Sequence, residues 1–249
     1  MNSPRKNDLA TRGFANGSLY NSARPDYPQA AIDYLVAAFG LNTSSRVLDL
    51  GAGTGIFSRQ MLPFVGTLTA VDPSASMRAS LIAESPGVEV LEGTDVAIPL
   101  EDHSVSAVFA AQAFHWFDHS RALAEIHRVL TPGGGLGLVW NERDESVEWV
   151  RELGIAMYWN LEQPYREGTD FSDVVAAGPF SDVTRVQFAH SQTLTREGLY
   201  RRVLTTSYIS IMDDEPRKKL MSDVEHVVEG LSEPFVLPYV TDVYTARAE

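Results

Sequence analysis

The feature that most constrains this chain is the segment 47–55, where an apolar run leads directly into glycines at positions 51, 53 and 55. The apolar run is typical of a buried parallel strand. The glycines allow the backbone to turn sharply and to approach a ligand where any Cβ would collide. A lone glycine loop is often only a tight turn, but a buried strand ending in this loop predicts a site for a nucleotide-type cofactor.

The residues that follow the loop indicate which type of cofactor the chain can bind. Ile56 stands where a dinucleotide fingerprint has a third glycine for helix packing, which disfavours NAD and FAD. A second strand is expected over residues 66–71, and Asp72 ends it about twenty residues after the loop. An acidic residue there can accept both ribose hydroxyls of an adenosine. Ser74 can cap the helix expected at 75–84, which leaves Asp72 for the ribose.

Short strands and helices alternate up to residue 144. Helices are expected at 28–39, 57–62, 75–84 and 119–130, and strands at 47–50, 66–71, 88–91, 106–111 and 136–140. The Thr-Pro-Gly-Gly-Gly segment 131–135 is expected to end the last helix and reverse the chain. This alternation predicts an α/β fold with a doubly wound, parallel sheet. Ligands of such sheets bind at the carboxyl ends of the strands.

The pattern changes after residue 144. Helices are expected at 147–161, 195–209 and 216–231, and strands at 183–189 and 236–247. The two late strands can complete the sheet as an antiparallel pair, while the helices cap the ligand end. Because no Pro-, Gly- and Ser-rich linker separates a second domain, we expect one domain with an inserted lid.

Composition and charge exclude several classes of function. Among 249 residues, 33 are acidic and 20 are Lys or Arg, a formal net charge of −13 that would repel a nucleic-acid backbone. There is no cysteine, which excludes disulfides and cysteine-bound zinc, and the six histidines show no metal-binding spacing. No apolar run is long enough to span a membrane, and the polar start lacks the apolar region of a secretory signal. We therefore expect a cytoplasmic protein with a small-molecule substrate, no nucleic-acid or membrane partner and no metal; a homodimer stays open.

Several strings of residues together carry a family resemblance. They are Tyr20 with Arg24-Pro25-Asp26-Tyr27-Pro28, residues 47–55, Ala70-Val71-Asp72-Pro73-Ser74, Ile98-Pro99-Leu100 with Ser104-Val105, residues 111–118 (AQAFHWFD) and residues 128–134 (RVLTPGG). In these strings the chain resembles the class I S-adenosylmethionine-dependent methyltransferases, and within them the trans-aconitate methyltransferase-like branch of small-molecule enzymes. The resemblance implies a seven-stranded, Rossmann-like sheet in a single domain 1–249, with an N-terminal cover (1–28), a cofactor-binding core (29–144) and lid helices with final strands (145–249).

The resemblance also implies positions for the cofactor S-adenosylmethionine. The glycine loop would pass beneath its methionine part, Asp72 would hold the ribose, and Met77 would pack on adenine. Asp95 stands where the family often has a different residue, so the adenine amino group would meet either its side chain or a backbone carbonyl. Gln112 would close the methionine side, and Arg24 would meet a carboxylate of cofactor or substrate. The full predicted set is Tyr20, Arg24, Gly51, Ala52, Gly53, Thr54, Asp72, Pro73, Met77, Thr94, Asp95, Val96, Gln112 and Ala113.

His115 is the candidate catalytic residue, because it follows the fourth strand among aromatic neighbours. It can act as a base, orient a substrate carboxylate, or only hydrogen-bond to the backbone. The candidate substrate pocket is Trp116, Phe117, Trp140, Arg143 and Tyr158. Ordinary core packing is the alternative for the aromatic members.

Three functions remain open at this level. The first is methyl transfer to a carboxylate oxygen of a small molecule, which needs no base because a carboxylate is already ionised near neutral pH. The second is methylation of a hydroxyl on a natural product or quinone-like ring, which benefits from a base such as His115. The third is an accessory protein that binds the cofactor without turnover.

Overall fold

A computed structural model describes residues 23–158 and 170–249, which fold into two compact units. The core unit contains residues 26–141, 170–188 and 241–249, and the helical unit contains residues 23–25, 142–158 and 189–240. Three long strands, β5 (Leu130–Arg143), β6 (Phe180–Leu194) and β7 (Phe235–Ala248), contribute residues to both units. The layout of one domain with a cover and a lid stays a prediction.

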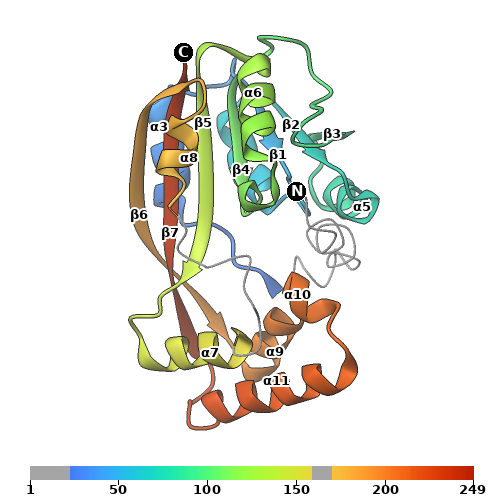
Figure 1. Cartoon of the computed structure of the whole chain (residues 1–249), viewed down its shortest axis with the longest axis vertical. Helices are drawn as coiled ribbons and strands as arrows, with labels where there is room; N and C mark the ends of the chain where they lie inside the picture. The colour runs from blue at the N-terminus through green and yellow to red at the C-terminus, as the bar shows by residue number, and fades with distance from the viewer. Residues whose placement is uncertain (1–22, 159–169) are drawn as a thin grey trace. The chain divides into compact units, whose positions relative to one another are not determined.

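The sheet has seven strands in the order β3-β2-β1-β4-β5-β7-β6 (Figure 1). Its first four strands are β1 (Arg46–Leu50), β2 (Thr67–Asp72), β3 (Glu89–Glu92) and β4 (Val105–Ala111). The pairs β3–β2, β2–β1, β1–β4 and β4–β5 are all parallel. Figure 1 shows β7 running opposite to β5 and β6. The predicted doubly wound, mostly parallel sheet is therefore confirmed, and the chain changes direction of winding between β1 and β4, where such folds bind ligands.

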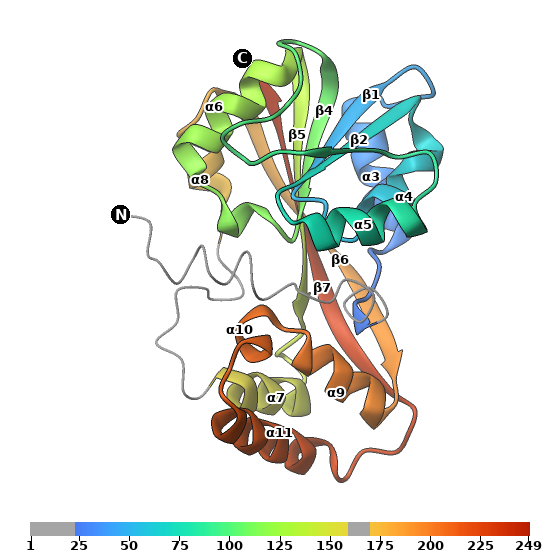
Figure 2. The same cartoon turned by 90° about the vertical axis from the view of Figure 1, so that its right-hand side faces the viewer.

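Helices cover both faces of this sheet in the core unit (Figure 2). They are α3 (Gln29–Phe39), α4 (Ile56–Met61) and α5 (Ala75–Glu84) on one face, and α6 (His119–Val129) and α8 (Ser172–Ala176) on the other. Two short 3₁₀ helices, η1 (Leu62–Phe64) and η2 (Phe114–Trp116), complete the unit. Each face buries its own apolar cluster, one around Leu35 and Phe109 and the other around Ile126 and Leu138.

Local chemistry explains most of these boundaries. α3 ends at Gly40, whose φ of 65° is the left-handed conformation that favours glycine after a helix. Ser74 caps α5, as the sequence predicts, because its hydroxyl accepts a hydrogen bond from the Met77 N–H at 3.5 Å.

The segment 131–135 differs from the expectation of a reversing loop, because β5 already begins at Leu130. A register shift in the pairing between Val105 and Ala107 allows the strand to start this early. Gly135 then passes directly under the Phe39 ring, where a Cβ would collide. Gly134 and Gly135 thus serve close packing, whereas Gly133, with a φ of 73° and no neighbour within 4 Å of an added Cβ, serves a backbone turn.

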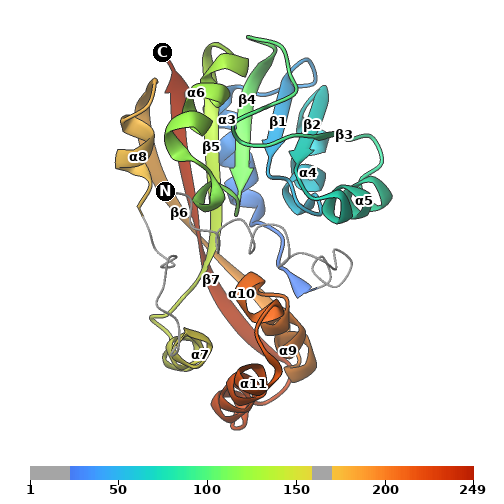
Figure 3. The same cartoon turned by 45° about the vertical axis from the view of Figure 1, so that its right-hand side comes forward.

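The helical unit contains α7 (Glu148–Tyr158), α9 (Arg196–Leu204), α10 (Ser207–Ser210) and α11 (Asp214–Val228), visible in Figure 3. Its interior is apolar and is built around residues such as Leu153, Leu199 and Val224. The helix expected at 195–209 is split in two, because Thr206 adopts an extended conformation between α9 and α10. Within residues 23–158 and 170–249, no helix is long and apolar enough to cross a bilayer.

Candidate active site

The glycine loop after β1 has the conformation that its sequence requires. Gly51 and Gly53 have φ angles of 72° and 56°, in the left-handed region. The N–H groups of Gly51 and Ala52 donate to the Val71 carbonyl at 2.8 and 3.2 Å, which ties the loop to the end of β2. A Cβ on Gly51 would lie 2.6 Å from the Ala113 Cβ, whereas a Cβ on Gly53 would meet nothing within 4 Å. The first glycine is therefore packed against protein, and the second borders open space that a ligand can enter.

Asp72 ends β2 and is bonded to the glycine loop. Its Oδ2 accepts from the Gly53 N–H at 2.9 Å, and its Oδ1 accepts from the Ser74 N–H at 2.8 Å. The side chain is 7% exposed, and this burial raises the pKa of Asp72, an effect that the two N–H donors oppose. Each carboxylate oxygen keeps a further lone pair, so Asp72 can still accept ribose hydroxyls.

Asp49 is a candidate site residue that the sequence analysis missed. It lies fully buried in β1, two residues before the loop, and burial raises its pKa to about 7. The Ser58 hydroxyl donates to its Oδ2 at 2.5 Å, while its Oδ1 has no hydrogen-bond partner among the described residues. A buried acceptor without a partner is costly and points to a ligand that supplies a donor. The available signal was a carboxylate inside an otherwise apolar strand.

The loop after β3 carries Thr94, Asp95 and Val96 of the predicted set. Thr94 exchanges backbone hydrogen bonds with Ala97, both at 3.2 Å, which forms a small turn. The Oδ2 of Asp95 accepts from the Asp118 N–H at 2.7 Å. One carboxylate oxygen of Asp95 therefore orders the start of α6, and an adenine contact by this residue stays a prediction.

Gln112 directly follows β4 in an unusual conformation. Its φ is 56°, which is rare for a residue with a side chain. Its N–H donates to the Val139 carbonyl at 2.8 Å, and its Nε2 donates to the Asn141 carbonyl at 3.1 Å. These bonds hold the ends of β4 and β5 together, and Ala113 follows as a buried residue beside the glycine loop. Backbone strain at the carboxyl end of a strand is typical of ligand sites.

His115 lies in η2 and is bonded to the neighbouring strand. The Nε1–H of Trp140 donates to the Nδ1 of His115 at 3.3 Å, and the Trp116 ring lies 5.0 Å from the His115 ring. Trp140 is 4% exposed and stacks on Phe171, with ring centroids 4.6 Å apart. The structure thus brings His115, Trp116 and Trp140 together on the carboxyl side of β4 and β5.

The remaining members of the predicted set differ in where they lie. Phe117 is buried and packs on Phe114 with centroids 5.6 Å apart, so that it belongs to the hydrophobic core as well. Arg24 and Arg143 belong to the helical unit, where they donate to the Thr205 carbonyl at 3.0 Å and to the Met157 sulfur at 2.7 Å. Tyr20 and the side chain of Tyr158 lie outside the described residues. Roles for these four residues stay predictions.

The core unit brings one set of predicted residues to the edge of its sheet where β1 to β5 end, either near the carboxyl end of a strand or in the segment that follows it. They are Gly51, Ala52, Gly53, Thr54, Asp72, Pro73, Met77, Thr94, Asp95, Val96, Gln112, Ala113, His115, Trp116 and Trp140. In the described ranges, no group of three or more His, Cys, Asp or Glu side chains forms a potential metal site.

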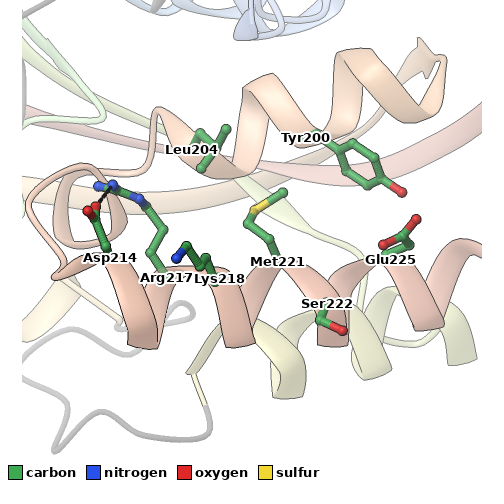
Figure 4. A pocket seen from close by; sticks show the side chains of 8 residues that line it. All are labelled: Tyr200, Leu204, Asp214, Arg217, Lys218, Met221, Ser222 and Glu225. Atoms are coloured by element: carbon green, nitrogen blue, oxygen red, sulfur yellow. Dashed lines mark hydrogen bonds and ion pairs between the residues drawn. The ribbon is translucent and has the colours of Figure 1, made fainter.

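The helical unit contains a groove whose lining residues are not among the predicted site residues. It has a volume of about 370 Å³ between α9 and α11, and Tyr200, Leu204 and Met221 line its apolar part (Figure 4). Figure 4 shows Arg217 paired with Asp214 on the same helix. Lys218 pairs with Glu215 in the same way, at 2.8 Å. Both cations of the groove are thus paired within α11, and the carboxylate of Glu225 lines the groove beside Tyr200.

Comparison with known proteins identifies the family. The model of the methyltransferase domain family matches residues 48–138, from β1 to β5. An uncharacterized methyltransferase of Mycobacterium tuberculosis is 40% identical over 247 residues, which is 97% of each chain. The chain belongs to the methyltransferases. A methyltransferase-like protein of Schizosaccharomyces pombe is 32% identical over 237 residues, 92% of this methyltransferase and 93% of the yeast protein.

Two further matches concern the fold and a more distantly related enzyme. A structure from Anabaena variabilis, described as a methyltransferase of an antibiotic biosynthesis pathway, aligns with a TM-score of 0.69 over 90% of this chain and 98% of its own, at 18% identity. This match shows the fold alone. A malonyl-[acyl-carrier protein] O-methyltransferase of Pectobacterium atrosepticum is 37% identical over 146 residues, 53% of this chain and 58% of its own. The class I S-adenosylmethionine-dependent family is confirmed, and the trans-aconitate branch stays a prediction.

Proposed function

We propose that this methyltransferase transfers the methyl group of S-adenosylmethionine to a carboxylate oxygen of a small organic acid. The observation that carries the proposal is the hydrogen bond from Trp140 to His115, because it occupies the lone pair of the candidate base. A carboxylate acceptor is ionised near neutral pH and needs no base, whereas a hydroxyl usually does.

The residues of the core unit fit the cofactor. Asp72 offers two carboxylate oxygens for ribose hydroxyls, and the open space beside Gly53 allows a close approach to the loop backbone. The unpartnered Oδ1 of Asp49 is an acceptor for an ammonium group, such as that of the cofactor's methionine part. When bound, the cofactor supplies a methyl group made electrophilic by a sulfonium centre.

The reaction then depends mainly on position. The carboxylate oxygen forms the new C–O bond while the C–S bond breaks; the electron pair stays on sulfur, and no proton moves. Such a displacement requires the two reacting groups to be aligned and shielded from water. We assign the alignment of the acceptor to His115, and the exclusion of water to the aromatic residues beside it.

The distant relatives support the same class of acceptor. A malonyl thioester carries a free carboxylate, so an O-methyltransferase that acts on a malonyl group is consistent with ester formation. The matching region spans about half of this chain, and it therefore supports the chemistry of the acceptor more than its identity.

The test is to incubate the protein with S-adenosylmethionine labelled in its methyl group and a panel of small carboxylic acids, phenols and alcohols. We expect label in the product of an acid, released as volatile methanol by mild base. The Asp72→Asn variant is the matched control and should transfer far less. Label that resists base would indicate an ether or an amine and would overturn the carboxylate proposal; no transfer across the panel would favour an accessory protein.

A further inference from the structure

We propose that Trp140 holds His115 in the neutral tautomer that carries its proton on Nε2, so that His115 works as a hydrogen-bond donor to an anionic acceptor and does not work as a base. The role toward the acceptor rests on the proposed function, whereas the tautomer itself does not. Trp140 is in this view a positioning residue.

The first step of the argument is the direction of the hydrogen bond. An indole nitrogen can only donate, so the 3.3 Å contact from Trp140 Nε1 requires a lone pair on His115 Nδ1. A neutral imidazole carries one proton, which must then sit on Nε2. Protonation of Nδ1 would place two N–H donors against each other and break this contact.

The second step is that Trp140 is not free to turn away. It is 4% exposed, its ring stacks on Phe171 at an interplanar angle of 11°, and the edge of the Tyr244 ring meets it with centroids 5.7 Å apart. All three residues lie in the core unit. If the contact with His115 were lost, a buried indole N–H would lose its acceptor, which is unfavourable.

The third step concerns chemistry at Nε2. A hydroxyl acceptor needs a group that takes its proton, and a nitrogen that already carries a proton cannot do so. A carboxylate instead needs donors that hold it in one orientation, and an N–H group is such a donor. The tautomer therefore selects for anionic acceptors and makes His115 a determinant of specificity.

The chain contains an internal reference for the opposite tautomer. His103 Nδ1 lies 2.8 Å from the Leu130 carbonyl oxygen. Because a carbonyl can only accept, His103 carries its proton on Nδ1. The two histidines should consequently show opposite patterns in the same spectrum.

The deciding experiment is a long-range ¹H–¹⁵N correlation spectrum of the ¹⁵N-labelled full chain at about pH 8, where histidines are mostly neutral. The His115→Gln variant assigns the His115 signals by their disappearance. We expect His115 to show a protonated Nε2 and an unprotonated Nδ1, and His103 to show the reverse. A protonated Nδ1 on His115 would overturn the proposal.

A variant pair tests the role of Trp140. Trp140→Phe keeps an aromatic ring and removes the N–H, so His115 should become a mixture of tautomers. Trp149→Phe is the control, since Trp149 packs on Phe235 in the helical unit. It should leave the His115 signals unchanged. Circular dichroism checks that both variants fold. If Trp140→Phe folds and still shows the wild-type tautomer of His115, the proposal is overturned. If Trp140→Phe does not fold, the spectrum of the wild-type protein decides the tautomer.

Methyl transfer adds a second readout once the panel has identified an acid. Gln places an N–H donor close to the position of Nε2 but cannot act as a base. We expect His115→Ala to lose about 10- to 100-fold in kcat/KM, as for the loss of a hydrogen bond to a charged group, and His115→Gln to recover most of it. Equal losses would overturn the donor role. If no acid is methylated, the proposed function fails, while the spectrum still decides the tautomer.

Discussion

The two units of this methyltransferase differ in what they bury. In the described ranges, the buried Asp, Ser and Thr residues all lie in the core unit, including Asp49, Ser58 and Asp72. The helical unit has an apolar interior, and several of its ion pairs lie along one exposed helix surface, such as Lys219 with Asp223. Buried polar groups cost stability unless they are paired. Three of these buried residues, Asp49, Thr54 and Asp72, lie in or beside the glycine loop. We therefore expect the ligand chemistry in the core unit and expect the helical unit to contribute shape.

The largest effect should come from Asp72→Asn, which keeps the size of the side chain and removes its charge. We expect S-adenosylhomocysteine to bind about 100-fold more weakly, equivalent to about 3 kcal/mol, because hydrogen bonds to a carboxylate are lost. Isothermal titration calorimetry measures the change. Asp214→Asn in the helical unit is the control and should bind as the wild type does. Unchanged binding by Asp72→Asn would contradict the comparison of the two units.

Gly51→Ala should have the next largest effect, on stability. The added Cβ would lie 2.6 Å from Ala113 Cβ, and the φ of 72° is strained for alanine. We expect a loss of about 2 kcal/mol and a Tm lower by about 4–8 °C in thermal unfolding. Gly53→Ala is the matched variant: it has a similar φ but no clash, so it should lose less stability and instead weaken S-adenosylhomocysteine binding. Equal losses of Tm would show that Gly51 is not packed as described.

The buried carboxyl of Asp49 should make stability depend on pH. Burial raises its pKa from 3.8 to about 7, so the folded state binds a proton between these values that the unfolded state has released. Stability from this group is therefore present at low pH and falls as pH rises, by at most about 1.4 kcal/mol per pH unit inside that window. Urea unfolding at about pH 5.5 and pH 8 should show wild type losing more stability than Asp49→Asn on going to the higher pH. If wild type and Asp49→Asn lose the same stability between the two pH values, the pKa of Asp49 is not raised.

The smallest expected changes in stability come from replacing one arginine in each unit. Arg128 in the core unit donates to the Leu100 carbonyl at 2.9 Å and the Ile98 carbonyl at 3.0 Å, and pairs with Glu125 at 2.8 Å. Arg128→Ala leaves these carbonyls without their donor, and we expect a loss of about 1–2 kcal/mol in urea unfolding. Arg201→Ala in the helical unit removes a pair with Glu197 at the surface of α9 and should cost less than about 0.5 kcal/mol. A reversed order would mean that the helical unit depends on its charges after all.

The sequence predicted the parts of the fold that depend on neighbouring residues. The glycine loop, the helix cap at Ser74 and the alternation of strands and helices are encoded within a few positions of each other. The early start of β5 was missed, because it depends on a shifted register with β4 and on Phe39 from a distant helix. The break between α9 and α10 was missed, because apolar residues continue at helical spacing across it.

The site shows the same division. Asp72 was predicted as a ribose-binding residue from its distance to the glycine loop, whereas Asp49 was interpreted only as part of an apolar strand. The contact of Trp140 with His115 joins residues 25 positions apart on adjacent segments of the sheet, so it follows from strand order and not from any local motif. Local patterns thus predict a ligand site, whereas the contact that we propose to set the protonation of His115 is tertiary.

The hydrogen bond between Asp72 and Gly53 has a thermodynamic consequence. Since the carboxylate already holds the loop backbone at 2.9 Å, the entropy of ordering that loop is lost when the chain folds and not when the cofactor binds. Less of the binding free energy of the cofactor is then spent on ordering the loop. If Asp72 binds the ribose as predicted, an affinity measured after changing it combines two quantities, the lost ribose contact and the cost of ordering the loop.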